Sequence, residues 1–358
     1  MYAVLFAETG LSAAEISSLF AIWSVTGFVL EVPSGAWADT FSRRRLLALA
    51  PILTGTGFAL WTFVPSYASF AVGFVLWGAG SAMQSGTEEA LVYEELARAG
   101  AAGAFARLIG RAEAVSTLAQ LFATLPAGLV LAAGGYHAVG LASVAATLLA
   151  AAAGWSLPES RARQERQRQR YLDVLRGGLA EVRHSRPLRR SLLLVAVLTG
   201  TAALDEYVPL LAQATGAGPV AMPLLVGLVT AGYAVGGWFA GRGTRWMAPW
   251  LVVGAGCLAA GALSGSPAGL ALVAVAYGVF QWAMAAADAR LQEHITDQAR
   301  ATVTSVAGLG TEIFGVAVFA GYALGSTWAG PGPLFALAAV PYLIIAVVLW
   351  PRTRSERR

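Results

Sequence analysis

The chain has 358 residues, of which 57% are hydrophobic and only 12% are charged. A soluble domain carries about 25% charged residues, so this composition excludes a protein whose whole surface faces water. All 24 basic residues are arginines. They lie in the loops between apolar stretches, a pattern that does not indicate nucleic-acid binding.

Eleven stretches are long and apolar enough to cross a bilayer, since a helix of about 20 residues spans the hydrocarbon. Every backbone group in lipid has to be hydrogen-bonded internally, so we expect these stretches to be helices in an all-α membrane protein. The predicted spans are residues 14–38, 46–65, 68–90, 112–133, 137–157, 190–211, 219–241, 246–264, 267–289, 302–323 and 332–350.

The segment Met1–Ala7 is apolar but too short to span the bilayer. We interpret it as the outer end of a partial first helix, and we expect the native start to lie about 15 or more residues upstream. No basic region typical of a signal peptide is present in the sequence.

The loops between the predicted spans alternate in charge. All 24 arginines fall in one alternating set of loops, which includes the run Ser42–Arg45 and the C-terminal tail, and none falls in the other set. Basic loops stay on the cytoplasmic side, so we predict a multi-pass protein of a bacterial cytoplasmic membrane with a cytoplasmic C-terminus.

The longest loop is rich in arginine and divides the spans into two groups. We interpret it as an interfacial helix on the cytoplasmic face, because its apolar residues have a partly helical spacing. The predicted organisation is an N-terminal half, a cytoplasmic linker, a C-terminal half and a cytoplasmic tail, at residues 1–157, 158–189, 190–350 and 351–358.

The loop after the first full span reads Gly-Ala-Trp-Ala-Asp-Thr-Phe-Ser-Arg-Arg-Arg from Gly35 to Arg45. It resembles the motif G-x-L-A-D-R-x-G-R-K/R of the major facilitator superfamily. The residues expected to act in conformational change are Gly35, Asp39, Arg43 and Arg44. The resemblance implies a fold of two six-helix halves, here with eleven full spans plus the partial first helix, and a function in secondary transport.

Further along, the segment Ser85–Leu91 resembles efflux members of this family, and Leu157–Ser160 resembles the proline-glutamate ending of its sixth helix. The arginine of the family's fourth-helix motif is absent, and its antiporter motif is reduced to Leu125–Gly128. The resemblance implies proton-coupled efflux of a small organic molecule or drug, without supporting it motif by motif.

Carboxylates inside the bilayer are costly and therefore indicate function. Glu312 lies near the middle of its span and Glu31 in the inner third of its own, whereas Asp205 and Glu206 lie in the outer part of theirs. We predict that one of these four couples transport to protons, and the sequence ranks Glu312 first, then Glu31, then Asp205. The alternative is a permanently protonated glutamate bonded to a neighbouring helix.

Polar and aromatic residues recur at helical spacing within several spans and could line a cavity for the solute. The alternatives are packing between small residues and, for the tryptophans, a position at the membrane interface. The candidate cavity residues are Trp77, Ser81, Gln84, Glu88, Gln120, Tyr233, Gln281 and Trp282.

No motif in the sequence indicates an enzyme, a cofactor or a metal site. The one cysteine, Cys257, lies inside an apolar run. We expect a monomer that handles a small molecule and protons in a lipid bilayer. A truncated, non-transporting relative and a polytopic membrane enzyme remain the alternatives.

Overall fold

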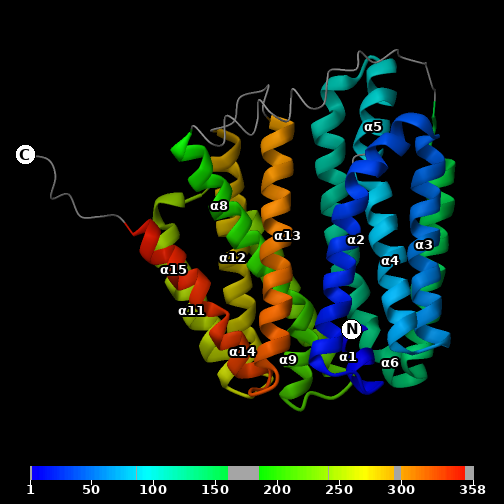
Figure 1. The fold of residues 1–358 in the computed structure, drawn as a ribbon. Coiled ribbons are helices and arrows are strands. Elements are labelled where there is room, and N and C mark those ends of the chain that lie inside the picture. The colour runs from blue at the N-terminus through cyan, green and yellow to red at the C-terminus, as the bar shows by residue number, and fades with distance from the viewer. Residues whose placement is uncertain (1, 86, 160–184, 241, 294–299, 351–358) are drawn as a thin grey trace, which may run out of the picture. The chain divides into compact units, whose positions relative to one another are not determined.

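The structure is a computed structural model that describes residues 2–85, 87–159, 185–240, 242–293 and 300–350. Within helices, the description omits the side chains of residues 31–36, 38–40, 89, 102, 106, 110, 113, 114, 117, 121, 125, 300–302 and 305. All regular secondary structure in these ranges is helical, which confirms the predicted all-α membrane fold. The chain divides into two compact units, Met1–Gln167 and Arg168–Arg358 (Figure 1).

Unit 1 is built from long helices that pack side by side. The helices α2, α3 and α4 contact one another, and α6 packs along α3 (Figure 1). The elements of this unit are α1 (Tyr2–Glu8), α2 (Ala13–Thr40), α3 (Arg43–Phe63), α4 (Tyr67–Gln84), α5 (Thr87–Arg98), the 3-10 helix η1 (Ala102–Ala104) and α6 (Phe105–Ser156).

Unit 2 has the same kind of packing, with α12 between α10 and α11, and α13 against α8. Its elements are α8 (Arg186–Thr201), the 3-10 helix η2 (Ala202–Tyr207), α9 (Val208–Ala214), α10 (Ala221–Trp238), the 3-10 helix η3 (Thr244–Trp246), α11 (Met247–Leu263), α12 (Gly269–Glu293), α13 (Arg300–Gly325), α14 (Pro331–Leu337) and α15 (Ala339–Leu349).

Serine side chains begin several of these helices. Ser12 and Glu15 form a capping box at the start of α2, in which the Glu15 N–H donates to the Ser12 hydroxyl and the Ser12 N–H donates to the Glu15 carboxylate. Ser42, Ser66 and Ser185 accept N–H groups in the same way at α3, α4 and α8. Each cap satisfies a donor that the first helical turn leaves free.

Most predicted spans coincide with observed helices, but the predicted span 68–90 is wrong at its end. The structure ends α4 at Gln84 and begins α5 at Thr87. Two other predicted spans, 112–133 and 137–157, are the two arms of α6. Gly135 separates them with φ 61° and ψ −163°, backbone angles that only glycine adopts readily.

Nine helical stretches of the described residues are long and apolar enough to cross a membrane. The helix α4 is not among them, and α6 contributes one stretch, Pro126–Ser156. The number of eleven spans therefore stays a prediction. The segment Met1–Ala7 contributes the helix α1, which packs on α2.

Glycines allow the helices of unit 2 to approach closely. A Cβ atom placed on Gly236 of α10 would lie 1.9 Å from the carbonyl oxygen of Gly278 on α12. Helix pairs in membranes gain their contacts from such small residues, because lipid offers no hydrophobic drive for association. The two backbones therefore touch at this crossing.

Candidate functional site

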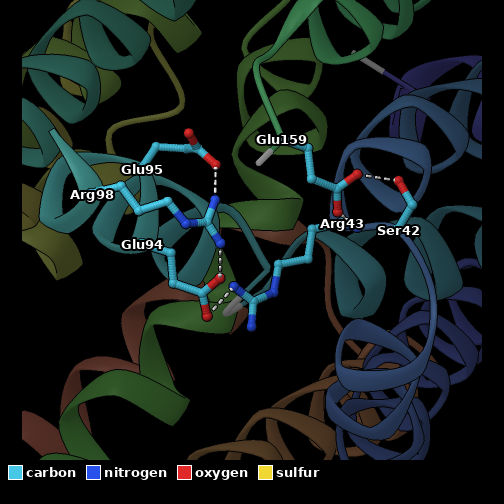
Figure 2. Close-up of polar contacts among 6 residues, drawn as sticks. All are labelled: Ser42, Arg43, Glu94, Glu95, Arg98 and Glu159. Atoms are coloured by element: carbon cyan, nitrogen blue, oxygen red, sulfur yellow. Dashed lines mark hydrogen bonds and ion pairs between the residues drawn. The ribbon is translucent and has the colours of Figure 1, made fainter. Parts of the chain in front are cut away.

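A polar network ties together three helix ends of unit 1 (Figure 2). The guanidinium of Arg43, at the start of α3, lies 2.7 Å from the Glu94 carboxylate of α5. The Arg43 backbone N–H donates to Glu159, just beyond α6, over 2.7 Å. This arginine–glutamate network consists of Ser42, Arg43, Glu94, Glu95, Arg98 and Glu159.

The network gives two of the predicted motif residues a definite position. Arg43 is buried, and the Glu159 carboxylate also accepts a hydrogen bond from the Ser42 hydroxyl. The guanidinium of Arg44 lies over the ring of Trp155 on α6, with 5.4 Å between the guanidinium carbon and the ring centre. For Glu31, Gly35 and Asp39 the structure describes only the helical backbone, so the side-chain contacts of Glu31 and Asp39 are outside the description. Arg43 and Arg44 thus both connect α3 to the end of α6.

Sequence reasoning missed the partners of Arg43 on α5. Arg98 follows Glu94 by four residues and Glu95 by three, which is the spacing of a helical turn and was the available signal. The Arg98 guanidinium lies 2.6 Å from Glu95 and 3.9 Å from Glu94. The carboxylate of Glu94 therefore has two arginine neighbours.

Trp77 belongs to an aromatic cluster at the centre of α1–α4. Its ring stacks parallel to Phe74 with centroids 6.0 Å apart, and it lies 5.0 Å from Trp23 and 5.6 Å from Tyr2. Phe74 is fully buried, whereas Trp77 is half-buried. The cluster is the core of unit 1, with Trp77 at its accessible edge.

The other candidate cavity residues of unit 1 do not lie on one helix. Ser81 and Gln84 are exposed on α4, Glu88 is on α5 beyond the break, and Gln120 is exposed on α6. Glu88, expected in the same span 68–90 as Trp77, therefore lies on a different helix, because α4 ends at Gln84.

In unit 2, a membrane-long stretch, Arg186–Ala214, is interrupted by the 3-10 helix η2. Pro209 explains the interruption, since proline has no N–H to donate to the carbonyl four residues earlier, that of Asp205. The Asp205 carbonyl accepts instead from the N–H of Val208, three residues on. A 3-10 segment inside a longer helix often marks a functional hinge.

The interruption carries two of the predicted carboxylates. Asp205 is exposed and Glu206 is half-buried. The charge of the Asp205 carboxylate acts on the hydroxyl groups of Tyr233 on α10, Tyr277 on α12 and Tyr342 on α15. We call Asp205, Glu206, Tyr233, Tyr277 and Tyr342 the carboxylate–tyrosine cluster.

Two polar atoms in this region are buried and have no hydrogen-bond partner among the described residues. They are the Tyr277 hydroxyl and the Gln281 Oε1 atom, both on α12. The Gln281 side chain packs toward α10, where a Cβ placed on Gly237 would lie 3.8 Å from Nε2. The predicted residues Asp205 and Glu206 thus lie on η2, directly after α8, while Tyr233 and Gln281 lie on α10 and α12, and α12 packs against both α8 and α10.

Two further candidates of unit 2 lie apart from this cluster. Trp282 is 8% exposed, and its indole N–H donates to the Arg242 carbonyl over 2.9 Å, which anchors the connection after α10. Glu312 is half-buried on α13. It follows Thr311, whose carbonyl would be 2.7 Å from a Cβ on Gly200 of α8. Glu312 therefore adjoins the crossing of α8 and α13.

A metal centre has no counterpart in the described part of the chain. No group of three or more histidine, cysteine, aspartate or glutamate side chains there could hold a metal ion. The carboxylate–tyrosine cluster and Gln281 together offer two carboxylates, three tyrosine hydroxyls and one amide.

The chain matches the family model described as Major Facilitator Superfamily over residues 1–308. No curated protein sequence matches it. Among solved structures, a point mutant of the nucleoside transporter NupG superimposes with a TM-score of 0.77 at 11% identity, covering 97% of this chain and 92% of that one.

Two further solved structures share the fold. A D-xylose-proton symporter has a TM-score of 0.65 at 15% identity, with 97% of this chain and 90% of that one covered. A bacterial homologue of the human lysosomal transporter Spinster, inward-facing and unoccupied, has a TM-score of 0.63 at 17% identity, with 95% and 88% covered. At these identities the likeness concerns the fold alone.

Proposed function

Because the chain belongs to the major facilitator superfamily, and is therefore a membrane-embedded secondary transporter of a small solute rather than an enzyme, we propose that it exports a small organic molecule in exchange for protons. In this proposal Asp205 is the carboxylate that binds and releases the proton. The observation that carries the proposal is the exposed Asp205 in the interrupted helix, beside Glu206 and three tyrosines.

The charge balance of unit 2 supports this role. Its basic side chains within the described residues are arginines near the starts and ends of spans: Arg186, Arg189, Arg190, Arg242, Arg245 and Arg290. Asp205 lies 15 residues beyond Arg190, about 22 Å along a helix that rises 1.5 Å per residue. A carboxylate at that depth is costly when charged, and among the described residues no arginine forms an ion pair with Asp205, so proton binding stabilises it.

Asp205 is preferred to Glu312, which the sequence ranks first. Asp205 lies in a 3-10 interruption, where the backbone can change its hydrogen bonding, and close to tyrosine hydroxyls. Glu312 lies within the unbroken helix α13. A residue that exchanges protons with both sides of a membrane benefits from such a hinge.

The direction and location of transport are part of the proposal. Export rests on the resemblance of Ser85–Leu91 to efflux members of the family. The arginine distribution supports a bacterial cytoplasmic membrane and a cytoplasmic C-terminus. We propose that the protein acts as a monomer.

Inverted membrane vesicles test this proposal directly. A pH gradient, acid inside, is followed by acridine orange, and solutes are added one at a time from a panel of amines, sugars, nucleosides and peptides. A transported solute dissipates the gradient and restores the fluorescence. We expect at least one solute to do so with the wild-type protein and not with Asp205→Asn.

Asp288→Asn is the matched control, because Asp288 is an exposed aspartate near the end of α12. It should respond as the wild type does. Loss of the response in Glu312→Gln with a normal response in Asp205→Asn would move the coupling site to Glu312. No response to any solute would support the non-transporting alternative.

A further inference from the structure

The function proposed above leaves two buried polar atoms of α12 without a role. Tyr277 is only 5% exposed, yet within the described ranges its hydroxyl has no hydrogen-bond partner, and neither has the buried Oε1 atom of Gln281. Buried polar atoms are nearly always hydrogen-bonded, and leaving one unmet is costly. Both atoms can therefore accept hydrogen bonds from a bound ligand.

The two atoms belong to one surface of the molecule. Tyr277 and Gln281 are four residues apart on α12, so their side chains share one face of the helix. Tyr233 and Gly237 have the same spacing on α10, which touches α12 at Gly236 and Gly278. A Cβ atom at position 237 would be in ordinary van der Waals contact with the Gln281 side chain, so the two positions are neighbours.

The charge next to these atoms is negative. Asp205 and Glu206 lie on η2, which directly follows α8, and α8 packs against α12, so the charges of the two carboxylates act on Tyr277. Asp205 is exposed and can therefore be reached by a solute. Arg190 lies about 22 Å along the helix from Asp205, as shown above.

The chemistry of the groups defines what can bind. Carboxylates and the Gln281 Oε1 atom only accept hydrogen bonds, and a tyrosine hydroxyl can accept one. The faces of tyrosine rings attract cations. A ligand that satisfies all of these groups at once carries several N–H donors and a positive charge.

We propose that Asp205, Tyr277 and Gln281 bind the protonated amino group of an organic amine, and that this amine is the transported solute. Asp205 supplies the counter-charge, while Tyr277 and Gln281 each accept an N–H. The identification of the bound amine as cargo rests on the proposed transport function, whereas its binding does not. A neutral polyhydroxy solute would meet the hydrogen bonds and leave the carboxylate charge unbalanced.

Calorimetric titration of the purified full-length protein at neutral pH tests the binding. The probes are phenethylamine and tryptamine, with phenethyl alcohol and tryptophol as neutral counterparts of the same shape. We expect the amines to bind at least tenfold more tightly than the alcohols. Asp205→Asn should remove this preference, because it keeps the shape of the side chain and loses its charge.

Tyr277→Phe removes a single oxygen atom and should weaken amine binding about tenfold, the effect expected of a lost hydrogen bond to a charged group. Tyr322→Phe is the matched control. Tyr322 is equally buried in unit 2 and stacks on Tyr207 at 3.7 Å, but only its burial and no charge of the cluster acts on it. Its variant should bind the amines as the wild type does.

Equal binding of amines and alcohols, no binding of either, or wild-type affinity in Tyr277→Phe would each overturn the proposal. If Asp205→Asn fails to fold, the wild-type comparison of amine with alcohol and the Tyr277→Phe variant still decide. Amine binding without any gradient dissipation would keep this site and refute proton-coupled export. Asp205-dependent dissipation of the gradient by a neutral solute alone would support proton-coupled export and refute the amine site.

Discussion

Replacing Arg43 by methionine removes the charge that joins α3 to α5 while keeping most of the apolar stem. The guanidinium lies 2.7 Å from Glu94, and the side chains are 10% and 38% exposed. Arg98 lies 3.9 Å from the same carboxylate, so Glu94 keeps one cationic neighbour in the variant. The backbone hydrogen bond from residue 43 to Glu159 does not depend on the side chain.

The size of the effect follows from this half-buried position. Exposed ion pairs contribute about 0.2–1 kcal/mol, and breaking a buried pair costs about 3–5 kcal/mol. The solvent that reaches Glu94 and the second arginine both reduce the loss. We therefore expect a coupling energy of about 1–2 kcal/mol between Arg43 and Glu94 in a double-mutant cycle.

The cycle uses Arg43→Met, Glu94→Gln and the double variant, with unfolding followed by circular dichroism as SDS is titrated into mixed micelles. The control cycle uses Arg98→Met and Glu95→Gln, a pair within one helix at 2.6 Å. The control should give about 0.3–0.5 kcal/mol, as local helix pairs do. A coupling between Arg43 and Glu94 no larger than that of the control would refute the view that this contact holds the two helices together.

Two further substitutions test the packing of the fold. Gly236→Ala should lower stability by about 1–3 kcal/mol, because its Cβ would lie 1.9 Å from the Gly278 carbonyl oxygen. Gly256→Ala, whose Cβ would meet nothing within 4 Å, should raise stability slightly. Thermal unfolding of the two purified variants compares them, and equal shifts in melting temperature would contradict the close crossing. Gly135→Ala should cost about 1–3 kcal/mol, since alanine is strained at φ 61°; proteolysis at the bend between the arms of α6 should accelerate, and an unchanged cleavage rate would count against the bend.

The positions of most helices could be predicted because their signals are local. Apolar runs of membrane length, and serine caps such as Ser12 with Glu15, lie within a few residues of the helix that they define. The end of α4 was missed because the spacing of Trp77, Gln84 and Glu88 stays helical across the break between α4 and α5. The interruption at η2 was also missed, although Pro209 was a usable signal for it.

The partners of the functional side chains could not be predicted, because they depend on contacts far apart in the sequence. Arg43 was identified from the motif, but its contact with Glu94 requires α3 and α5 to pack together. Asp205, on η2 directly after α8, likewise acts on Tyr277 because α8 packs against α12. The unmet hydroxyl of Tyr277 has no sequence signal at all, since it reflects what a side chain fails to contact.

The bonds of Glu159 to the start of α3 also set an order of events during biosynthesis. Ser42 and Glu159 are 117 residues apart, so a ribosome adding about 5–20 residues per second delivers the second partner about 6–23 s after the first. Throughout that interval the start of α3 lacks the carboxylate that accepts its Arg43 N–H. The hydrogen bonds between Glu159 and the start of α3 can therefore form only after translation has passed α6.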